Sequence, residues 1–310
     1  MPGLSQGDQC SQIVTSNQDS SEGMLLSDDV ALVASNLDHI LKSSSYKLAH
    51  TDNELLESDA LHSLRLMLEF KKPDLILDEH HINSTIVVFG GTQVVEHCEA
   101  ERRLKDAQEK LEENPQEPSC QRNLQRQQRL QKLSFFYNEA RLFAQLATRA
   151  SQSEGQKDFV VVTGAGPGLM EAANRGAFDV GGQSIGLGVT LPFEETPNPF
   201  ITPELCFQFD SIALRKLHFL KRAAAVVLFP GGFGSLDELF EVLTLRLTQK
   251  MSPLPIILVG KDFWSNVINF EFLADSGLIP DAALDLFSYA ESAKEAWEII
   301  CRFNPDDSCP

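Results

Sequence analysis

The sequence lacks several features that would place it in a familiar class of protein. No apolar run approaches the roughly eighteen residues of a membrane-spanning helix, so we expect no transmembrane segment and no membrane partner. The first twenty residues contain no Lys or Arg and no apolar stretch, so we expect no signal peptide. None of the six cysteines forms a C-x-x-C pair or a disulfide-framework spacing. These absences favour a soluble protein in a reducing cytoplasm.

Basic residues are few relative to acidic ones. The chain has 26 Lys and Arg against 44 Asp and Glu, for a net charge of −18, and residues 1–90 alone carry fourteen acids and five bases. Such a charge argues against nucleic acid as the main partner. A small phosphate ligand is still permitted, because a helix N-terminus and one or two cations act within about 10 Å.

Patterns typical of a metal site are also missing. The only adjacent histidines, His80 and His81, cannot face one ion from the same side of a helix or strand. We therefore expect neither a metal ion nor another cofactor.

The 310 residues suffice for one large α/β domain with an appendage. The composition predicts a mobile tail over 1–25 and a helical N-terminal extension over 26–80, whose last helix we expect Lys71-Lys72-Pro73 to end. Residues 81–310 are predicted to form a Rossmann-like nucleotide-binding catalytic domain. Within it, the charged segment 99–132 reads as a helical insertion.

Short apolar runs alternate with helical patterns along this domain. They predict a doubly wound parallel sheet with helices on both faces, with strands over 85–89, 158–163, 184–190, 206–209, 224–229 and 255–259. Glycine loops follow three of these strands, at 90–91, 164–168 and 231–234. Because the carboxyl ends of parallel strands share one edge, the loops predict a nucleotide or sugar-phosphate crevice there.

The most informative stretch is AAAVVLFPGGFGSLDELFEVL, residues 223–243. A buried strand ends at Pro230-Gly231-Gly232, and a helical pattern opens near Ser235. A strand, a glycine turn and a helix start together offer free backbone N–H groups to a phosphate. Ser235 and Glu238 also fit an S-x-x-E capping box, on which reading the glycines only make a tight turn. The local sequence leaves both interpretations open.

Two common nucleotide-binding classes fit poorly. Gly164, Gly166 and Gly168 form G-x-G-x-G rather than G-x-G-x-x-G, and no acidic residue ends the next strand. No Gly-Lys-Ser or Gly-Lys-Thr follows any strand, so a Walker-type ATPase is not indicated either.

Taken together, four segments resemble the Lonely Guy family of nucleoside 5′-monophosphate phosphoribohydrolases, often labelled "possible lysine decarboxylase". These segments are GAGPGLMEAANRGA (164–177), LPFE (191–194) with Asn198, LRK (214–216) and PGGFGSLDE (230–238). The resemblance runs from about Thr85 to the C-terminus. It implies hydrolysis of the N-glycosidic bond of a nucleotide such as AMP or an N6-substituted AMP. It also implies a homodimer or larger homo-oligomer.

The resemblance also implies roles for individual residues. Arg215 and Glu238 match the family's catalytic positions. The positions that would bind the 5′-phosphate are Gly231, Gly232, Gly234 and Ser235. Those that would lie near the rest of the nucleotide are Gly90, Gly91, Gly164, Gly166, Gly168, Met170 and Lys216.

The chemistry agrees with these residue types. Cleaving a ribosyl bond builds positive charge at C1′, which a carboxylate such as Glu238 can stabilise while it orients water. Arg215 can support the phosphate or the departing base. The neighbouring Asp237 and Glu241 are interpreted as solvated helix residues.

The sequence departs from the family pattern at three positions. Ser235 replaces the usual Thr, Ala165 stands where Gly is common, and Gln93 stands where longer members carry an Arg. A decarboxylase is not indicated, because Lys216 is the only lysine in the motif region and lies beside Arg215. A nucleotide-binding carrier or sensor without chemistry remains the alternative.

Overall fold

The computed structural model describes residues 27–153, 156–190, 192 and 196–303. The predicted tail over 1–25 lies outside these residues. The chain divides into two units, Met1–His62 and Ser63–Pro310, each treated separately below. Among the described residues, no helix is long and apolar enough to cross a membrane.

The first unit contains short helical elements. α1 spans Ser27–Lys42 and α2 spans Asn53–Glu57, with single 3-10 turns at Ser44–Tyr46, Ala49–Thr51 and Asp59–Leu61. The side chain of Asp52 caps α2 by accepting a hydrogen bond from the Leu55 N–H at 3.4 Å.

The second unit is built on a seven-stranded sheet with the order β6-β5-β4-β1-β7-β8-β9. All six strand pairs are parallel. The strands are β1 Thr85–Phe89, β4 Val160–Thr163, β5 Ser184–Val189, β6 Cys206–Phe209, β7 Ala223–Leu228, β8 Ile256–Val259 and β9 Ser288–Ala290. The predicted doubly wound parallel sheet is confirmed.

Helices cover both faces because the central strands alternate their side chains between two apolar clusters. Ile86 and Val88 of β1 join the cluster that contains α6 (Phe135–Ser151), α7 (Leu169–Asp179) and α12 (Ala293–Phe303). Val87 and Phe89 join the opposite cluster. The helices of that second face are α3 (His62–Glu79), α8 (Ile212–Lys221), α9 (Phe233–Leu247), α10 (Lys261–Val267) and α11 (Phe270–Asp275). The second unit also has two-residue strands at Gln152–Ser153 and Gln156–Lys157 and 3-10 helices at Pro203–Leu205 and Asp281–Leu286.

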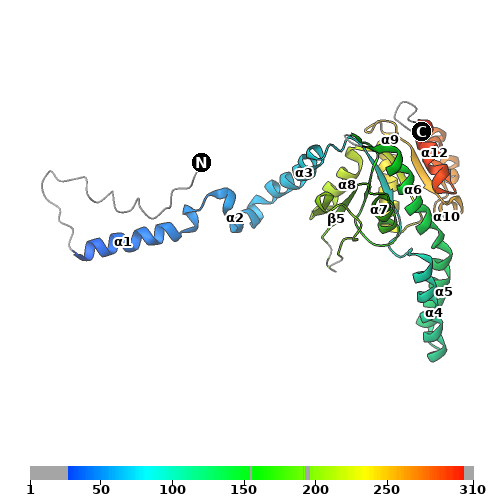
Figure 1. Cartoon of the computed structure of the whole chain (residues 1–310), viewed down its shortest axis with the longest axis horizontal. Coiled ribbons are helices and arrows are strands. Elements are labelled where there is room, and N and C mark those ends of the chain that lie inside the picture. The colour runs from blue at the N-terminus through cyan, green and yellow to red at the C-terminus, as the bar shows by residue number, and fades with distance from the viewer. Residues whose placement is uncertain (1–26, 154–155, 191, 193–195, 304–310) are drawn as a thin grey trace. The chain divides into compact units, whose positions relative to one another are not determined.

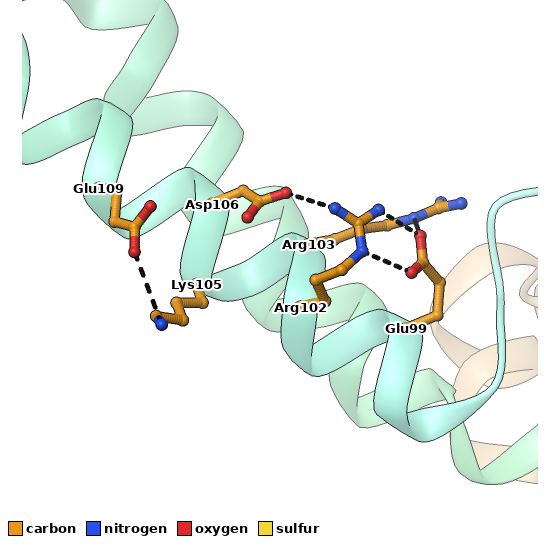
Figure 2. Close-up of polar contacts among 6 residues, drawn as sticks. All are labelled: Glu99, Arg102, Arg103, Lys105, Asp106 and Glu109. Carbon is orange, nitrogen blue, oxygen red and sulfur yellow. Dashed lines mark hydrogen bonds and ion pairs between the residues drawn. The ribbon is translucent and has the colours of Figure 1, made fainter.

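The charged segment forms a helical hairpin of α4 (His97–Glu113) and α5 (Pro118–Leu133), which extends away from the sheet (Figure 1). The two helices bury few side chains, since Ala100 and Ala107 are the only buried residues of α4 and no residue of α5 is buried. The α4 charges pair along their own helix. Figure 2 shows Glu99 between Arg102 and Arg103, with further pairs Arg102–Asp106 and Lys105–Glu109.

One sequence-based expectation about the elements is wrong, and one strand was missed. Lys71-Lys72-Pro73 does not end a helix, because α3 continues through Pro73 to Glu79. Both Pro73 and Leu77 are buried, so packing of the second half of α3 on the sheet outweighs the hydrogen bond that proline removes. The seventh strand, β9, was not predicted, since three residues are too few to show an alternating pattern.

Candidate active site

The three glycine loops meet at the point where the strand order reverses. The first strand, β1, lies between β4 and β7, so the chain winds outward from β1 in both directions. The loops after β4, β1 and β7 are therefore neighbours at the carboxyl edge of the sheet. Ligands of doubly wound sheets bind at such a switch point.

Backbone contacts interlock these loops. The Gly91 N–H donates to the Pro230 carbonyl at 2.9 Å, and the Leu169 N–H donates to the Gly91 carbonyl at 3.2 Å. Gly168, at the start of α7, has φ +73°, and a Cβ there would lie 2.5 Å from the Gly91 oxygen and 2.6 Å from the Thr92 oxygen. Only glycine satisfies both the left-handed backbone and this approach.

We expect Gly168→Ala to destabilise the fold by at least about 3 kcal/mol, because it adds a backbone collision to the strain of a positive φ. The matched control is Gly181→Ala, since Gly181 has φ +74° but nothing within 4 Å of its missing Cβ. That control measures the cost of placing alanine at a positive φ without a collision. We expect Gly181→Ala to lower the free energy of unfolding by about 1 kcal/mol. Urea unfolding of both variants checks the difference; equal losses would contradict the interlocked loops.

The helix after the third loop begins earlier than the capping-box reading requires. Gly232 is the N-cap of α9, no side chain caps it, and the Leu236 N–H bonds to the Gly232 carbonyl at 3.0 Å. Ser235 therefore lies inside the first turn, so the capping-box interpretation is wrong. Helix geometry leaves the N–H groups of the first turn, from Phe233 to Ser235, without intrahelical acceptors.

The turn before α9 is tightly closed. A Cβ on Gly231 would lie 2.1 Å from the Ser235 Oγ, and the Ser235 side chain is buried. A Cβ on Gly232 or on Gly234 would meet nothing within 4 Å. The loop thus places the Ser235 hydroxyl against its own backbone and leaves open space at two glycines, where an anion could approach.

Arg215 reaches this edge from α8. Its Nε donates to the Leu187 carbonyl at 2.8 Å, its Nη2 lies 3.4 Å from the Gly164 oxygen, and its guanidinium stacks 5.2 Å from the Phe219 ring centre. Among the described residues, no carboxylate lies within ion-pair distance of it. Burial lowers the pKa of the Arg215 guanidinium, and the charge of Glu238 opposes this effect. A partly buried cation held by neutral groups is suited to receive an anionic ligand.

Glu238 is the buried carboxylate of the site. The residue is only 7% exposed, and within the described part of the chain its Oε2 has no hydrogen-bond partner. Burial raises the pKa of Glu238 to about 7; Lys216 and Arg215 counteract this effect, whereas Glu241 and Asp237 add to it. A carboxyl group with a pKa near neutrality changes protonation state easily, as a general acid or base must.

Lys216 connects α8 to the acidic residues of α9. Its Nζ lies 2.9 Å from Asp237 Oδ2 and 3.1 Å from Glu241 Oε2, and its side chain is only 17% exposed. Burial lowers the pKa of Lys216, but the hydrogen bonds to the two carboxylates outweigh this effect, so the pKa of Lys216 is raised. Asp237 and Glu241 are therefore ion-paired with Lys216.

A buried polar network fixes the loop after β4. The side-chain Oδ1 of Asn174 accepts hydrogen bonds from the Thr163 hydroxyl at 2.7 Å and from the Asn198 Nδ2 at 3.0 Å. The Asn198 amide also donates to the Ala165 and Gly166 carbonyls at 3.2 and 3.1 Å. Ala165 has φ +66°, which explains why glycine is common at its position. Asn174 and Thr163 were missed from the sequence, and the one available signal is a polar side chain on an otherwise apolar helix face.

Met170 and the first loop complete the surroundings. A Cβ on Gly164 would lie 3.0 Å from the Met170 sulfur and 2.4 Å from Arg215 Nη2, and one on Gly166 would lie 2.7 Å from the Met170 Cε. A Cβ on Gly90 would lie 2.6 Å from the Leu169 Cβ. Gln93 is exposed, and its amide lies 3.5 Å from the Thr92 hydroxyl. In the LPFE segment, positions 191, 193 and 194 lie outside the described residues.

Residues 170–300 match the family model described as "Possible lysine decarboxylase". The resemblance to the Lonely Guy family is confirmed. The matched segment contains Arg215, Lys216 and the whole loop from Pro230 to Glu238.

Two curated relatives are similar over part of the chain. "Pyrimidine/purine nucleotide 5'-monophosphate nucleosidase" of Escherichia coli strain K12 is 35% identical over 124 residues, which are 37% of this chain and 27% of that protein. "Cytokinin riboside 5'-monophosphate phosphoribohydrolase LOG1" of Arabidopsis thaliana is 29% identical over 141 residues, which are 44% of this chain and 64% of that protein. The chain thus spans about a quarter of the length of the bacterial relative.

Among solved structures, the X-ray structure of the structural-genomics target TM1055 is 18% identical and has a TM-score of 0.40. The match covers 71% of this chain and 99% of that one.

Proposed function

We propose that the protein hydrolyses the N-glycosidic bond of a nucleoside 5′-monophosphate, most readily AMP or an N6-substituted AMP, to free base and ribose 5-phosphate. One observation carries the proposal. Among the described residues, Glu238 of α9 has a buried carboxylate oxygen without a hydrogen-bond partner, and Arg215 of α8 has a guanidinium without a carboxylate partner; each influences the pKa of the other at the same edge of the sheet. Buried polar groups are normally paired, so this pair is expected to find its partners in a substrate.

In this proposal the 5′-phosphate binds at the start of α9. The first-turn N–H groups and the Ser235 hydroxyl would donate to it, and the open space at Gly232 and Gly234 would admit its oxygens. Gly90, Gly91 and Met170 would lie near the remainder of the nucleotide.

The chemistry falls to Glu238. As the C1′–N bond breaks, positive charge develops at C1′, and the ionised carboxylate stabilises this charge and orients the water that attacks. The bonding electrons and a proton go to the departing base, and the hydroxyl of the water goes to C1′. Arg215 would bind the phosphate or the base through the guanidinium nitrogens that its two carbonyl contacts leave free.

The names of the two curated relatives support this substrate class, because one is called a nucleotide 5′-monophosphate nucleosidase and the other a riboside 5′-monophosphate phosphoribohydrolase. Neither name decides which base this chain prefers.

A substrate panel tests the proposal. Purified protein is incubated with each nucleoside 5′-monophosphate and, in parallel, with adenosine, which lacks the phosphate. We expect free base from at least one monophosphate and at least about 100-fold less from adenosine, since the α9 N-terminus would have no anion to bind. Binding of AMP without any turnover would instead support a carrier or sensor.

Lys216 gives a pH-dependent prediction. We expect base release to rise with pH through about 7 in the natural protein, as Glu238 ionises. Lys216→Met removes the cation that favours the ionised carboxylate, so this rise is expected to move to higher pH. Adding Glu241→Gln removes one opposing negative charge and is expected to move it back towards neutrality. pH–rate profiles of the three proteins decide this, and coincident profiles would contradict the electrostatic role of Lys216.

Homo-oligomerisation belongs to the same proposal. Around α8 and α9 several apolar side chains are exposed, and Phe233, next to the proposed phosphate loop, is 92% exposed; the others are Ile212, Leu217, Phe240 and Leu247. A groove of about 830 Å³, lined in part by Leu217, Leu245 and Met251, lies beside them. A second copy would cover this surface, and light scattering of the purified protein would measure the oligomeric state.

The cytoplasmic location, the lack of a cofactor and the domain bounds stay predictions from the sequence.

A further inference from the structure

The exposed side of α5 differs in charge from the rest of the chain. Its sequence, PSCQRNLQRQQRLQKL, contains four cations and no acid, in a protein with 44 acids and 26 bases. All four cations are exposed. Arg122, Arg126 and Arg129 follow each other at i, i+4 and i+7, so they share one helix face about 10 Å long. We call these three residues, with Lys132, the α5 basic surface.

The neighbouring helix shows the usual arrangement. On α4, basic side chains pair with acids three or four residues away, as Figure 2 shows for Arg102 and Lys105. Along the described part of the chain, no acid lies within ion-pair distance of the α5 basic surface. Like charges at these spacings destabilise a helix. The α5 basic surface is therefore a cost to the isolated hairpin, which an anionic partner would offset.

We propose that the α5 basic surface binds an acidic, Asp- and Glu-rich segment of a partner protein. Guanidinium groups pair with carboxylates through two parallel hydrogen bonds, and a helix with acids at i, i+4 and i+7 repeats the spacing of the arginines. A segment with three or four carboxylates matches the four positive charges of the α5 basic surface. It therefore brings little excess negative charge towards a chain of net charge −18. Nucleic acid, with one charge per about 1.7 Å, meets much stronger repulsion from the rest of the molecule.

The test uses the full chain and a fluorescein-labelled 18-residue helical peptide with Glu at i, i+4, i+7 and i+11. The same peptide with Gln at these positions and a 12-nucleotide single-stranded RNA serve as alternative probes. Binding is followed by fluorescence anisotropy at about 50 and about 300 mM salt, where screening separates electrostatic from other binding. The variant is Arg122→Gln, Arg126→Gln and Arg129→Gln together.

A matched control carries Lys72→Gln, Arg149→Gln and Lys294→Gln. These three residues are also exposed, and the control has the same net charge as the α5 variant because each loses three positive charges. We expect the α5 variant to bind the Glu peptide at least tenfold more weakly than the natural chain, and the control to bind within twofold of it. Circular dichroism checks that the helix content is unchanged.

Three results would overturn the proposal. The Glu peptide and the Gln peptide could bind equally, the two variants could lose binding equally, or the RNA could bind more tightly than the Glu peptide through the same arginines. The last result would make the surface a nucleic-acid site. All these measurements are independent of nucleotide turnover.

Discussion

Glu238→Gln is expected to abolish base release and, at the same time, to stabilise the fold at alkaline pH. Removing a charged group that acts at the reacting centre lowers rates by about a thousandfold or more in comparable sites. The amide cannot ionise, so it avoids the penalty of a buried charge. The loss of activity is measured as kcat/KM for the preferred nucleotide, and the stability by urea unfolding.

The sign of the stability effect follows from the raised pKa. The carboxyl of Glu238 has an ordinary pKa of 4.5 when exposed and about 7 in the folded chain, so folding favours its protonated form. Its contribution to stability is fully present below pH 4.5 and is lost as the pH rises through 7. At 1.36 kcal/mol per pKa unit, the loss reaches about 3 kcal/mol above pH 7. We expect the free energy of unfolding of Glu238→Gln to exceed that of the natural chain by up to this amount at pH 8. At pH 5 the difference should be less than about 1 kcal/mol.

The control is Glu112→Gln, an exposed glutamate on the hairpin. It should leave both activity and the pH dependence of unfolding unchanged. A Glu238→Gln protein that is less stable than the natural chain at pH 8 would contradict this account and would show that the carboxylate stabilises the fold.

Arg215→Met is expected to lower kcat/KM for the nucleotide by about 100-fold. Methionine preserves the long apolar stem but removes the charge and the hydrogen bonds to the Leu187 and Gly164 carbonyls. A charge-assisted contact with substrate is worth about 1.5–3 kcal/mol, which corresponds to a factor of about 10 to 150. Steady-state kinetics with AMP and with adenosine show which part of the nucleotide Arg215 contacts. If Arg215 binds the phosphate, only the reaction of AMP is affected; if it binds the base, both are.

Arg215→Lys separates charge from geometry. An ammonium keeps the charge but has no planar fork to reach two carbonyls and a ligand together, so we expect an intermediate loss. Arg149 is exposed and makes no ion pair with any residue that the structure describes, so Arg149→Met should behave like the natural protein. Equal activity of Arg215→Lys and the natural chain would mean that only the local charge matters.

The sequence predicted the architecture well because its signals are local. Runs such as TIVVF and PIILV are short, apolar and followed by glycine, which is how a buried parallel strand reads. The prediction from sequence failed where tertiary contacts determine an element. Pro73 is accommodated inside α3 by packing, and β9 is held by pairing with β8.

The same distinction applies to the site. The glycine loops could be found from spacing, and Arg215 and Glu238 from the family pattern. The pairing of Lys216 with Asp237 and Glu241 was not predicted, because it depends on how α8 packs against α9. The Thr163–Asn174–Asn198 network also joins residues far apart in the chain, so no local pattern reveals it.

The measurement that tests the central proposal most directly is product stoichiometry. Purified protein is incubated with AMP at pH 7.5, and adenine, ribose 5-phosphate, adenosine and inorganic phosphate are quantified together, with Glu238→Gln in parallel. We predict adenine and ribose 5-phosphate in equal amounts from the natural chain and neither from the variant. Adenosine with inorganic phosphate, or equal turnover by both proteins, would contradict hydrolysis of the N-glycosidic bond at Glu238.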